Sequence, residues 1–261
     1  MIRFTKPRSK KGFDPGSESF KLSRSKLDMF LNCPRCFYLD RKHGITRPPS
    51  YPFTLNNAVD NLLKKEFDYY RSRQEPHPLM LEAGIDAVPF DHPRLNEWRD
   101  ALHAGIQYKV PGTNIILTGG IDDVWIGSDG KLILVDYKAT SKAGQVSLDA
   151  DWQIAYKRQI EIYQYLFMSN GFDVSKTAYF VYCNGKANNE RFDKHLDFDI
   201  SVLPYEGDIG WVEKAVSYAY NCLCMDDIPD AGTSCAHCKY VNQVSECLSV
   251  GSSNSMGASR R

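Results

Sequence analysis

The sequence predicts an α/β fold in which a central mixed β-sheet is flanked by helices, and a cysteine cluster joins the N- and C-terminal segments. Two observations support this prediction. Short apolar runs with strand-like pattern fill residues 106–137 and return after residue 176, and stretches with helical periodicity surround them. Cys-x-x-Cys pairs also stand near both ends of the chain, at Cys33–Cys36 and Cys235–Cys238.

The strands are expected in two blocks. The first block should end in a hairpin, because Ser128-Asp129-Gly130 is a turn signal between two apolar runs. The second block follows a helical stretch and ends in an alternating pattern. The expected strands are residues 106–110, 114–118, 121–126, 132–137, 177–183 and 196–200.

Helices are expected around these strands. Ser25 is a candidate N-cap for a helix that leads to Cys33, and apolar residues at helical spacing predict a second helix over residues 53–70. Prolines mark the loop-rich region that follows. The remaining expected helices are residues 98–105, 151–169 and 209–224.

Length and composition indicate one ordinary globular domain. Of the 261 residues, 43% are hydrophobic and 25% are charged, so we expect a domain at residues 21–247 between a flexible basic leader (1–20) and a disordered tail (248–261). The net charge is zero, which argues against a protein that coats DNA non-specifically. No apolar run is long enough for a membrane span and no secretory signal is visible, so we expect a cytoplasmic protein without a membrane partner.

Three residues indicate phosphodiester chemistry. Asp122 follows Gly119-Gly120-Ile121, and Asp136 and Lys138 end the apolar run of the next predicted strand. Carboxylates from neighbouring strands bind a hard divalent cation such as Mg²⁺. Lys138 lies two residues beyond Asp136 and therefore points to the same face. A metal-activated water and a nearby ammonium group are what phosphodiester hydrolysis requires.

This arrangement resembles the PD-(D/E)XK nuclease superfamily. The resemblance rests on Asp122 and on Asp136-Tyr137-Lys138, and it is strengthened by Gln159 and Tyr163. These last two match the Gln-x-x-x-Tyr element of the RecB-like branch, to which CRISPR-associated exonucleases belong. The resemblance implies a restriction-endonuclease-like sheet with Gln159 and Tyr163 on one helix face.

The resemblance also implies further metal ligands. The backbone carbonyl of Tyr137 would join Asp122 and Asp136 around Mg²⁺ or Mn²⁺. RecB-like nucleases usually carry a histidine on an early helix, and Asp60 stands where that histidine is expected. Aspartate suits a hard cation, but a solvated surface acid is an equal alternative at this position, and Glu66 is a second candidate ligand.

The two Cys-x-x-Cys pairs indicate a metal or cluster site, because paired thiolates at this spacing hold zinc or an iron–sulfur cluster. In the CRISPR-associated relatives, one N-terminal and three C-terminal cysteines hold a [4Fe-4S] cluster. Cys33, Cys235 and Cys238 match that set, but Val244 stands where the last ligand is expected. We take Cys36 as the fourth ligand, with Cys247 as the alternative, and leave [4Fe-4S] and Zn²⁺ both open.

The predicted function is metal-dependent hydrolysis of DNA, with exonuclease action on single-stranded ends favoured. Asp122 and Asp136 would bind the metal, Lys138 would assist the reaction, and Gln159 and Tyr163 would support the site. Two alternatives are a non-catalytic nucleic-acid-binding module with the same fold and a nuclease that acts on RNA. The expected partner is DNA, single-stranded or with an end, and a protein partner in a DNA-processing or defence complex is also considered.

Overall fold

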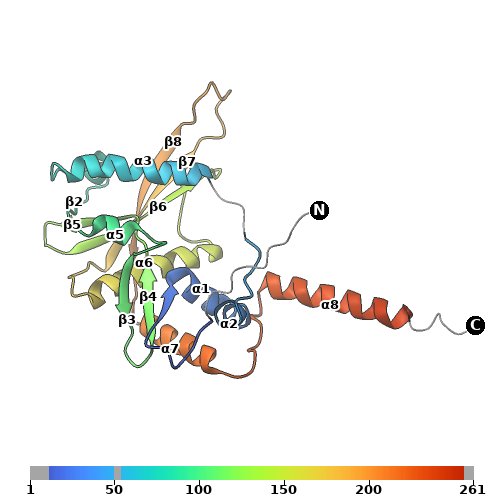
Figure 1. The fold of residues 1–261 in the computed structure, drawn as a ribbon. Helices are drawn as coiled ribbons and strands as arrows, with labels where there is room; N and C mark the ends of the chain where they lie inside the picture. Colours follow the sequence, from blue (N-terminus) through green and yellow to red (C-terminus); the bar gives the residue numbers. More distant parts are fainter. Residues whose placement is uncertain (1–11, 50–53, 256–261) are drawn as a thin grey trace, which may run out of the picture.

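A computed structural model describes residues 12–49 and 54–255, with side chains described up to residue 249 (Figure 1). Its larger sheet has five strands in the order β2-β5-β6-β7-β8. The neighbours β6 and β7 are parallel and the other pairs are antiparallel, so the sheet is mixed as predicted. These strands are β2 (Ala87–Pro89), β5 (Asp123–Gly127), β6 (Leu132–Thr140), β7 (Thr177–Gly185) and β8 (Phe198–Glu206).

A second, three-stranded sheet departs from the single sheet that was expected. It consists of β1 (Phe20–Ser23), parallel to β4 (Ile115–Gly119), and β3 (Ile106–Lys109), antiparallel to β4. The chain leaves this sheet at Gly119-Gly120, where a Cβ on Gly120 would lie 2.3 Å from the Cβ of Ala101. The N–H of Ile121 bonds to the carbonyl of Trp98, so the predicted strand 121–126 begins only at Asp123.

Helices cover both faces of the five-stranded sheet. Helix α6 (Ile154–Ser169) contacts strands of both sheets, and all residues from Gln159 to Phe167 are buried. Helix α3 (Thr54–Arg71) packs on the opposite face through Leu63 and Phe67. The other helices are α1 (Arg24–Asn32), α2 (Pro34–Lys42), α4 (Pro78–Glu82), α5 (Leu95–Arg99), the 3-10 helix η1 (Asp151–Gln153), α7 (Val212–Cys224) and α8 (Ala236–Ser255).

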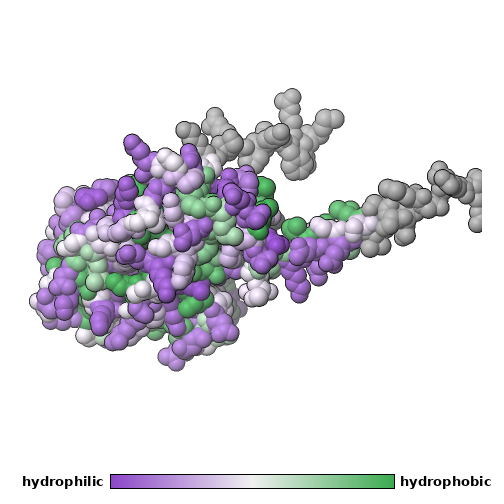
Figure 2. Space-filling view, turned by 90° about the horizontal axis from the view of Figure 1, so that it is seen from below, coloured by the Kyte–Doolittle hydropathy of each residue, from purple (hydrophilic) through white to green (hydrophobic). Residues whose placement is uncertain are grey.

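The two ends of the chain differ from the expected leader and tail. Residues 1–11 lie outside the described part, but Phe13 is buried and packs against Phe20 and Tyr220 at ring distances of 5.2 and 5.8 Å. Helix α8 continues to Ser255, where disorder was expected from residue 248; residues 256–261 are not described. Figures 1 and 2 show α8 extending away from the body. Among the described helices, none is long and apolar enough to cross a membrane.

Candidate active site and cysteine centre

The central strand β6 carries the core of the candidate site. Residues 132–137 are buried in succession, because β6 lies between β5 and β7 and is covered by helices on both faces. Asp136 is completely buried, and Lys138 lies one alternation further on the same face, near the carboxyl end of the strand. Strand β6 therefore places the carboxylate of Asp136 and the ammonium group of Lys138 side by side near its carboxyl end.

Asp136 is held by side chains from helix α6. Its Oδ1 atom accepts a hydrogen bond from Nε2 of Gln159 at 2.7 Å, and the same nitrogen lies 3.0 Å from the hydroxyl oxygen of Tyr163. Gln159 and Tyr163 are four residues apart and thus share one face of α6. The Oδ2 atom is buried and is ion-paired with Nζ of Lys138.

Burial raises the pKa of the Asp136 carboxyl to about 7, against the lowering effect of the Lys138 charge. For Lys138, burial lowers the pKa of the ammonium group, but the negative charges of Asp136 and Asp122 outweigh burial and raise it. Lys138 therefore stays protonated at neutral pH. Its Nζ atom also lies 4.4 Å from the ring centre of Tyr156.

The carboxylates of Asp122 and Asp60 both contact the ammonium group of Lys64. Oδ2 of Asp122 accepts a hydrogen bond from the N–H of Tyr137 at 2.9 Å. Nζ of Lys64 lies 2.8 Å from Oδ2 of Asp60 and 3.3 Å from Oδ1 of Asp122. Burial and the charge of Asp122 raise the pKa of Asp60. Glu66, the other candidate on α3, bonds to His77 instead and does not line the site.

An open cavity of about 540 Å³ brings most of the predicted residues together. Asp60, Asp122, Tyr137, Lys138 and Gln159 line it, and Asp136 lies buried behind Lys138. Further lining residues are Arg24, Asn56, Asn57, Val59, Ala139 and Tyr156. Carboxylate and amide oxygens are hard donors of the kind that Mg²⁺ or Mn²⁺ prefers, and Asp60, Asp122 and Gln159 offer them in this cavity. The donor chemistry of these residues suits a divalent cation, but among the described residues the carboxylate oxygens of Asp60, Asp122 and Asp136 do not all lie within 4.8 Å of one another.

Asp123 points into the core, which separates it from Asp122. The Asp123 side chain is completely buried and forms ion pairs with Arg71 and with Arg99, the latter at 3.0 Å. It also accepts a hydrogen bond from the hydroxyl of Tyr137 at 2.8 Å. Adjacent carboxylates thus occupy opposite environments, and only Asp122 lines the cavity.

Two basic residues of the site were not predicted as site residues from the sequence. Lys64 follows Asp60 by one helical turn, and this i,i+4 spacing is the signal that could have identified it. Arg24 is the first residue of α1 and lines the cavity. Its positive charge lowers the pKa values of both Asp136 and Tyr163, although burial raises them more.

The four predicted cysteines converge at a second site. The Sγ atoms of Cys33, Cys36, Cys235 and Cys238 all lie within 4.8 Å of one another. The shortest separations are 3.5 Å for Cys36–Cys238, 3.6 Å for Cys36–Cys235 and 3.7 Å for Cys33–Cys238. Within the described residues, no other cluster brings three or more candidate ligand atoms this close. The cluster joins the N- and C-terminal segments, as predicted, and Cys36 completes the set rather than the exposed Cys247.

Hydrogen-bond donors stabilise the thiolate of Cys33, whereas burial raises the pKa values of Cys36 and Cys238. Burial raises the pKa of Cys33, but hydrogen bonds from the N–H groups of Gly232 and Cys36 outweigh burial and lower it to about 6. A guanidinium nitrogen of Arg47 lies 3.6 Å from Sγ of Cys235. A Cβ on Gly232 would lie 2.2 Å from the carbonyl oxygen of Asn32, so glycine allows the two segments to approach.

Comparison with known proteins identifies the family of this chain. The family model of the PD-(D/E)XK nuclease superfamily matches residues 54–243. The chain is also similar to a solved structure described as "Crystal structure of SSO0001", with 14% identity over 80% of this chain and 78% of that one and a TM-score of 0.38. No curated protein matches the sequence. The matched residues include Asp122, strands β5 and β6 and helix α6. The chain therefore belongs to the PD-(D/E)XK nuclease superfamily.

Proposed function

We propose that this protein is a Mg²⁺- or Mn²⁺-dependent deoxyribonuclease that hydrolyses phosphodiester bonds at single-stranded DNA ends. The observation that carries the proposal is the buried Asp136–Lys138 pair on the central strand, next to Asp122 in an open cavity. Burying two charges is unfavourable for stability compared with apolar side chains, so their retention at a cavity supports a chemical role.

Each residue has a distinct role in this proposal. Asp122, Asp136 and the carbonyl of Tyr137 would hold the metal, and Asp60 would add a fourth oxygen donor. When bound, the metal would supply Lewis-acid chemistry: a lower pKa for a water molecule and polarisation of the phosphate. Lys138, protonated at neutral pH, neutralises charge that develops on the phosphate.

Helix α6 positions the buried carboxylate. Gln159 donates to Oδ1 of Asp136, and the other oxygen, Oδ2, is paired with Lys138. Tyr163 stands beside Gln159 on the same face and limits its rotation. Such outer contacts orient metal ligands and commonly change metal affinity when they are removed.

The preference for DNA ends rests on the resemblance to the RecB-like branch. Its Gln-x-x-x-Tyr element is present at Gln159 and Tyr163, and paired cysteines flank the nuclease core. Asp60 in place of the branch's usual histidine retains a metal-binding side chain that lines the cavity.

We further propose that the cysteine centre holds one tetrahedral ion, zinc, in a structural role. Four thiolates at about 2.3 Å from a single Zn²⁺ stand about 3.8 Å apart. The close Sγ separations of 3.5, 3.6 and 3.7 Å support this spacing. A [4Fe-4S] cube places an iron atom between each thiolate and the cluster centre and so needs thiolates that stand further apart.

The test compares end-labelled linear single-stranded DNA, its circular form and RNA of the same sequence, each with Mn²⁺. Cleavage of the linear DNA by the wild type but not by Lys138→Ala, with the circle intact, is the expected result. Cleavage of the circle would replace the exonuclease assignment with endonuclease action, and preference for RNA would overturn the DNA assignment. Binding without cleavage, in protein whose cysteine centre is filled, would favour the non-catalytic module.

A further inference from the structure

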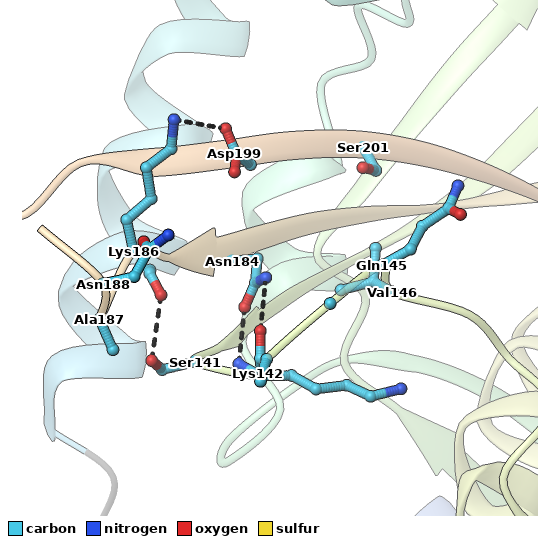
Figure 3. Close-up of a pocket in the computed structure, with 13 residues that line it drawn as sticks. Ser141, Lys142, Gln145, Val146, Asn184, Lys186, Ala187, Asn188, Asp199 and Ser201 are labelled. Carbon is cyan, nitrogen blue, oxygen red and sulfur yellow. Dashed lines mark hydrogen bonds and ion pairs between the residues drawn. The ribbon is translucent and has the colours of Figure 1, made fainter.

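A second open cavity, of about 650 Å³, lies at the carboxyl end of the strand pair that carries the candidate active site. We name it the strand-end basin; it is lined by residues 141–146, which follow β6, and by residues 184–188 at the end of β7, with Asp199 and Ser201 of β8 (Figure 3). In α/β sheets, ligands bind outside the carboxyl ends of the strands. The basin has this position.

Sheet register places the basin on the same face as the catalytic candidates. Lys138 pairs with Tyr182 and Thr140 with Asn184 in the parallel β6–β7 ladder. Asn184 in turn pairs with Asp199 across β7–β8. Paired residues on neighbouring strands project to the same face, and residues two apart on a strand do so too. Lys142 follows two residues after Thr140, the last residue of β6, and lines the basin.

Two lysines and three amide side chains lie among the lining residues, with little that would recognise bases. The lining offers the side chains of Gln145, Asn184 and Asn188 and the ammonium groups of Lys142 and Lys186. Lys186 is paired with Asp199 at 2.7 Å, but Lys142 has no ion pair with any described residue. Figure 3 shows Lys186 directed to Asp199 and Lys142 extending from the strand end. No aromatic ring lines the basin, so phosphates suit it better than stacked bases.

Hydrogen bonds fix the backbone that carries Lys142. The N–H of Lys142 donates to Oδ1 of Asn184 at 2.8 Å, and Nδ2 of Asn184 donates to the carbonyl of Lys142 at 3.0 Å. The hydroxyl of Ser141 donates to the carbonyl of Gly185 at 3.0 Å. The exposed ammonium group therefore extends from an anchored strand end, which reduces the entropy lost when it contacts a ligand.

The distance from Lys138 to Lys142 suits a nucleic-acid strand. Lys142 lies four residues after Lys138 and two residues beyond the end of β6, which allows at most about 13 Å at about 3.3 Å per residue. A stacked strand advances about 3.4 Å per nucleotide, so this distance spans about four nucleotides. A strand with its scissile phosphate at Lys138 can thus reach Lys142 with a phosphate a few nucleotides away.

We propose that the strand-end basin binds the phosphate backbone of the nucleic-acid substrate, with Lys142 as its main contact and Asn184 as the residue that positions Lys142. This inference rests on the proposed nuclease function and names the path that the strand takes away from the active site. Lys186, neutralised by Asp199, contributes less than Lys142.

The first test measures binding of fluorescein-labelled oligodeoxythymidylate to the full chain by anisotropy, without added Mg²⁺ or Mn²⁺, over a series of salt concentrations. One phosphate contact to a single strand contributes a slope of about 0.7 to the dependence of log Kd on log salt. Lys142→Gln is expected to reduce the slope by about 0.7 and to weaken binding about five-fold at about 0.1 M salt. Lys214→Gln, an exposed lysine on α7, is the matched control, and Asp199→Asn should tighten binding by freeing Lys186.

Cleavage kinetics separate this inference from the proposed function. With long linear DNA and Mn²⁺, Lys142→Gln should raise KM with a much smaller change in kcat, and the effect should vanish on oligonucleotides too short to reach the basin. If the wild type cleaves DNA and Lys142→Gln matches Lys214→Gln in Kd, salt slope and KM, phosphate binding by the basin is refuted. The proposed nuclease activity is then still supported. If Lys142→Gln weakens binding but the wild type cleaves no DNA, the proposed nuclease activity is refuted, and phosphate binding by the basin is still supported. No binding by the wild type would refute both.

Discussion

The adjacent residues Asp122 and Asp123 should respond in opposite ways to the same substitution, aspartate to asparagine. Asp123 is completely buried against Arg71 and Arg99, whose side chains are only 6% and 10% exposed. Removing one partner of a buried ion pair leaves an uncompensated charge, which costs about 3–5 kcal/mol. At about 2–4 °C per kcal/mol for a protein near this size, Asp123→Asn should lower Tm by about 6–20 °C.

Asp122→Asn should leave the fold nearly as stable as the wild type. The side-chain oxygen of asparagine can still accept the hydrogen bond from the N–H of Tyr137, and the lost ion pair with Lys64 is partly exposed, which is typically worth about 0–1 kcal/mol. Activity should instead fall at least about 100-fold, because a metal ligand that supports several kcal/mol of transition-state stabilisation is lost.

Urea denaturation and Mn²⁺-dependent cleavage, measured on both variants, separate the two roles. Equal destabilisation by Asp122→Asn and Asp123→Asn would refute the structural role assigned to Asp123. Full activity in Asp122→Asn would refute the assignment of Asp122 to the metal site.

Three further predictions concern other parts of the molecule. Gln159→Leu removes the donor to Asp136 and should raise the Mn²⁺ concentration needed for half-maximal cleavage about 10–100-fold; an unchanged Mn²⁺ dependence would contradict this. Cys36→Ser should lower bound zinc, measured by metal analysis, and Tm together, whereas Cys224→Ser, an exposed cysteine, should change neither. Burial lowers the pKa of His77 below 6.5, so the unfolded chain takes up this proton first as pH falls. The free energy of unfolding should therefore fall below about pH 6.5, and less so in His77→Gln.

The parts of the fold that depend on local pattern were predictable from the sequence. The apolar run of β6, the turn at residues 128–130 and the helices α3, α6 and α7 follow from periodicity and turn chemistry, whereas α8 was not predicted. Gln159 and Tyr163 were expected on one face because they are four residues apart, and both lie beside Asp136. The Cys-x-x-Cys spacing predicted the cysteine centre in the same way.

The parts that depend on long-range pairing were not predictable. Strand β1 is four residues long and is stabilised by parallel pairing with β4, nearly a hundred residues later, so its own sequence gives little signal. The sequence Gly119-Gly120 predicts a turn. It does not show that Gly120 packs closely against Ala101, at the point where the chain passes from the three-stranded to the five-stranded sheet. Lys64 joins the site only because α3 packs beside β6, where Asn56 bonds to the carbonyl of Ala139 at 2.9 Å.

Mn²⁺-dependent cleavage of end-labelled single-stranded DNA, with wild type beside Lys138→Ala, tests the central claim most directly. Both proteins must first be shown to be folded and to have a filled cysteine centre. The account predicts a product ladder from the wild type, no cleavage without Mn²⁺ or Mg²⁺, and loss of cleavage in Lys138→Ala. Equal cleavage by the two proteins, or cleavage that does not depend on the metal, would contradict it.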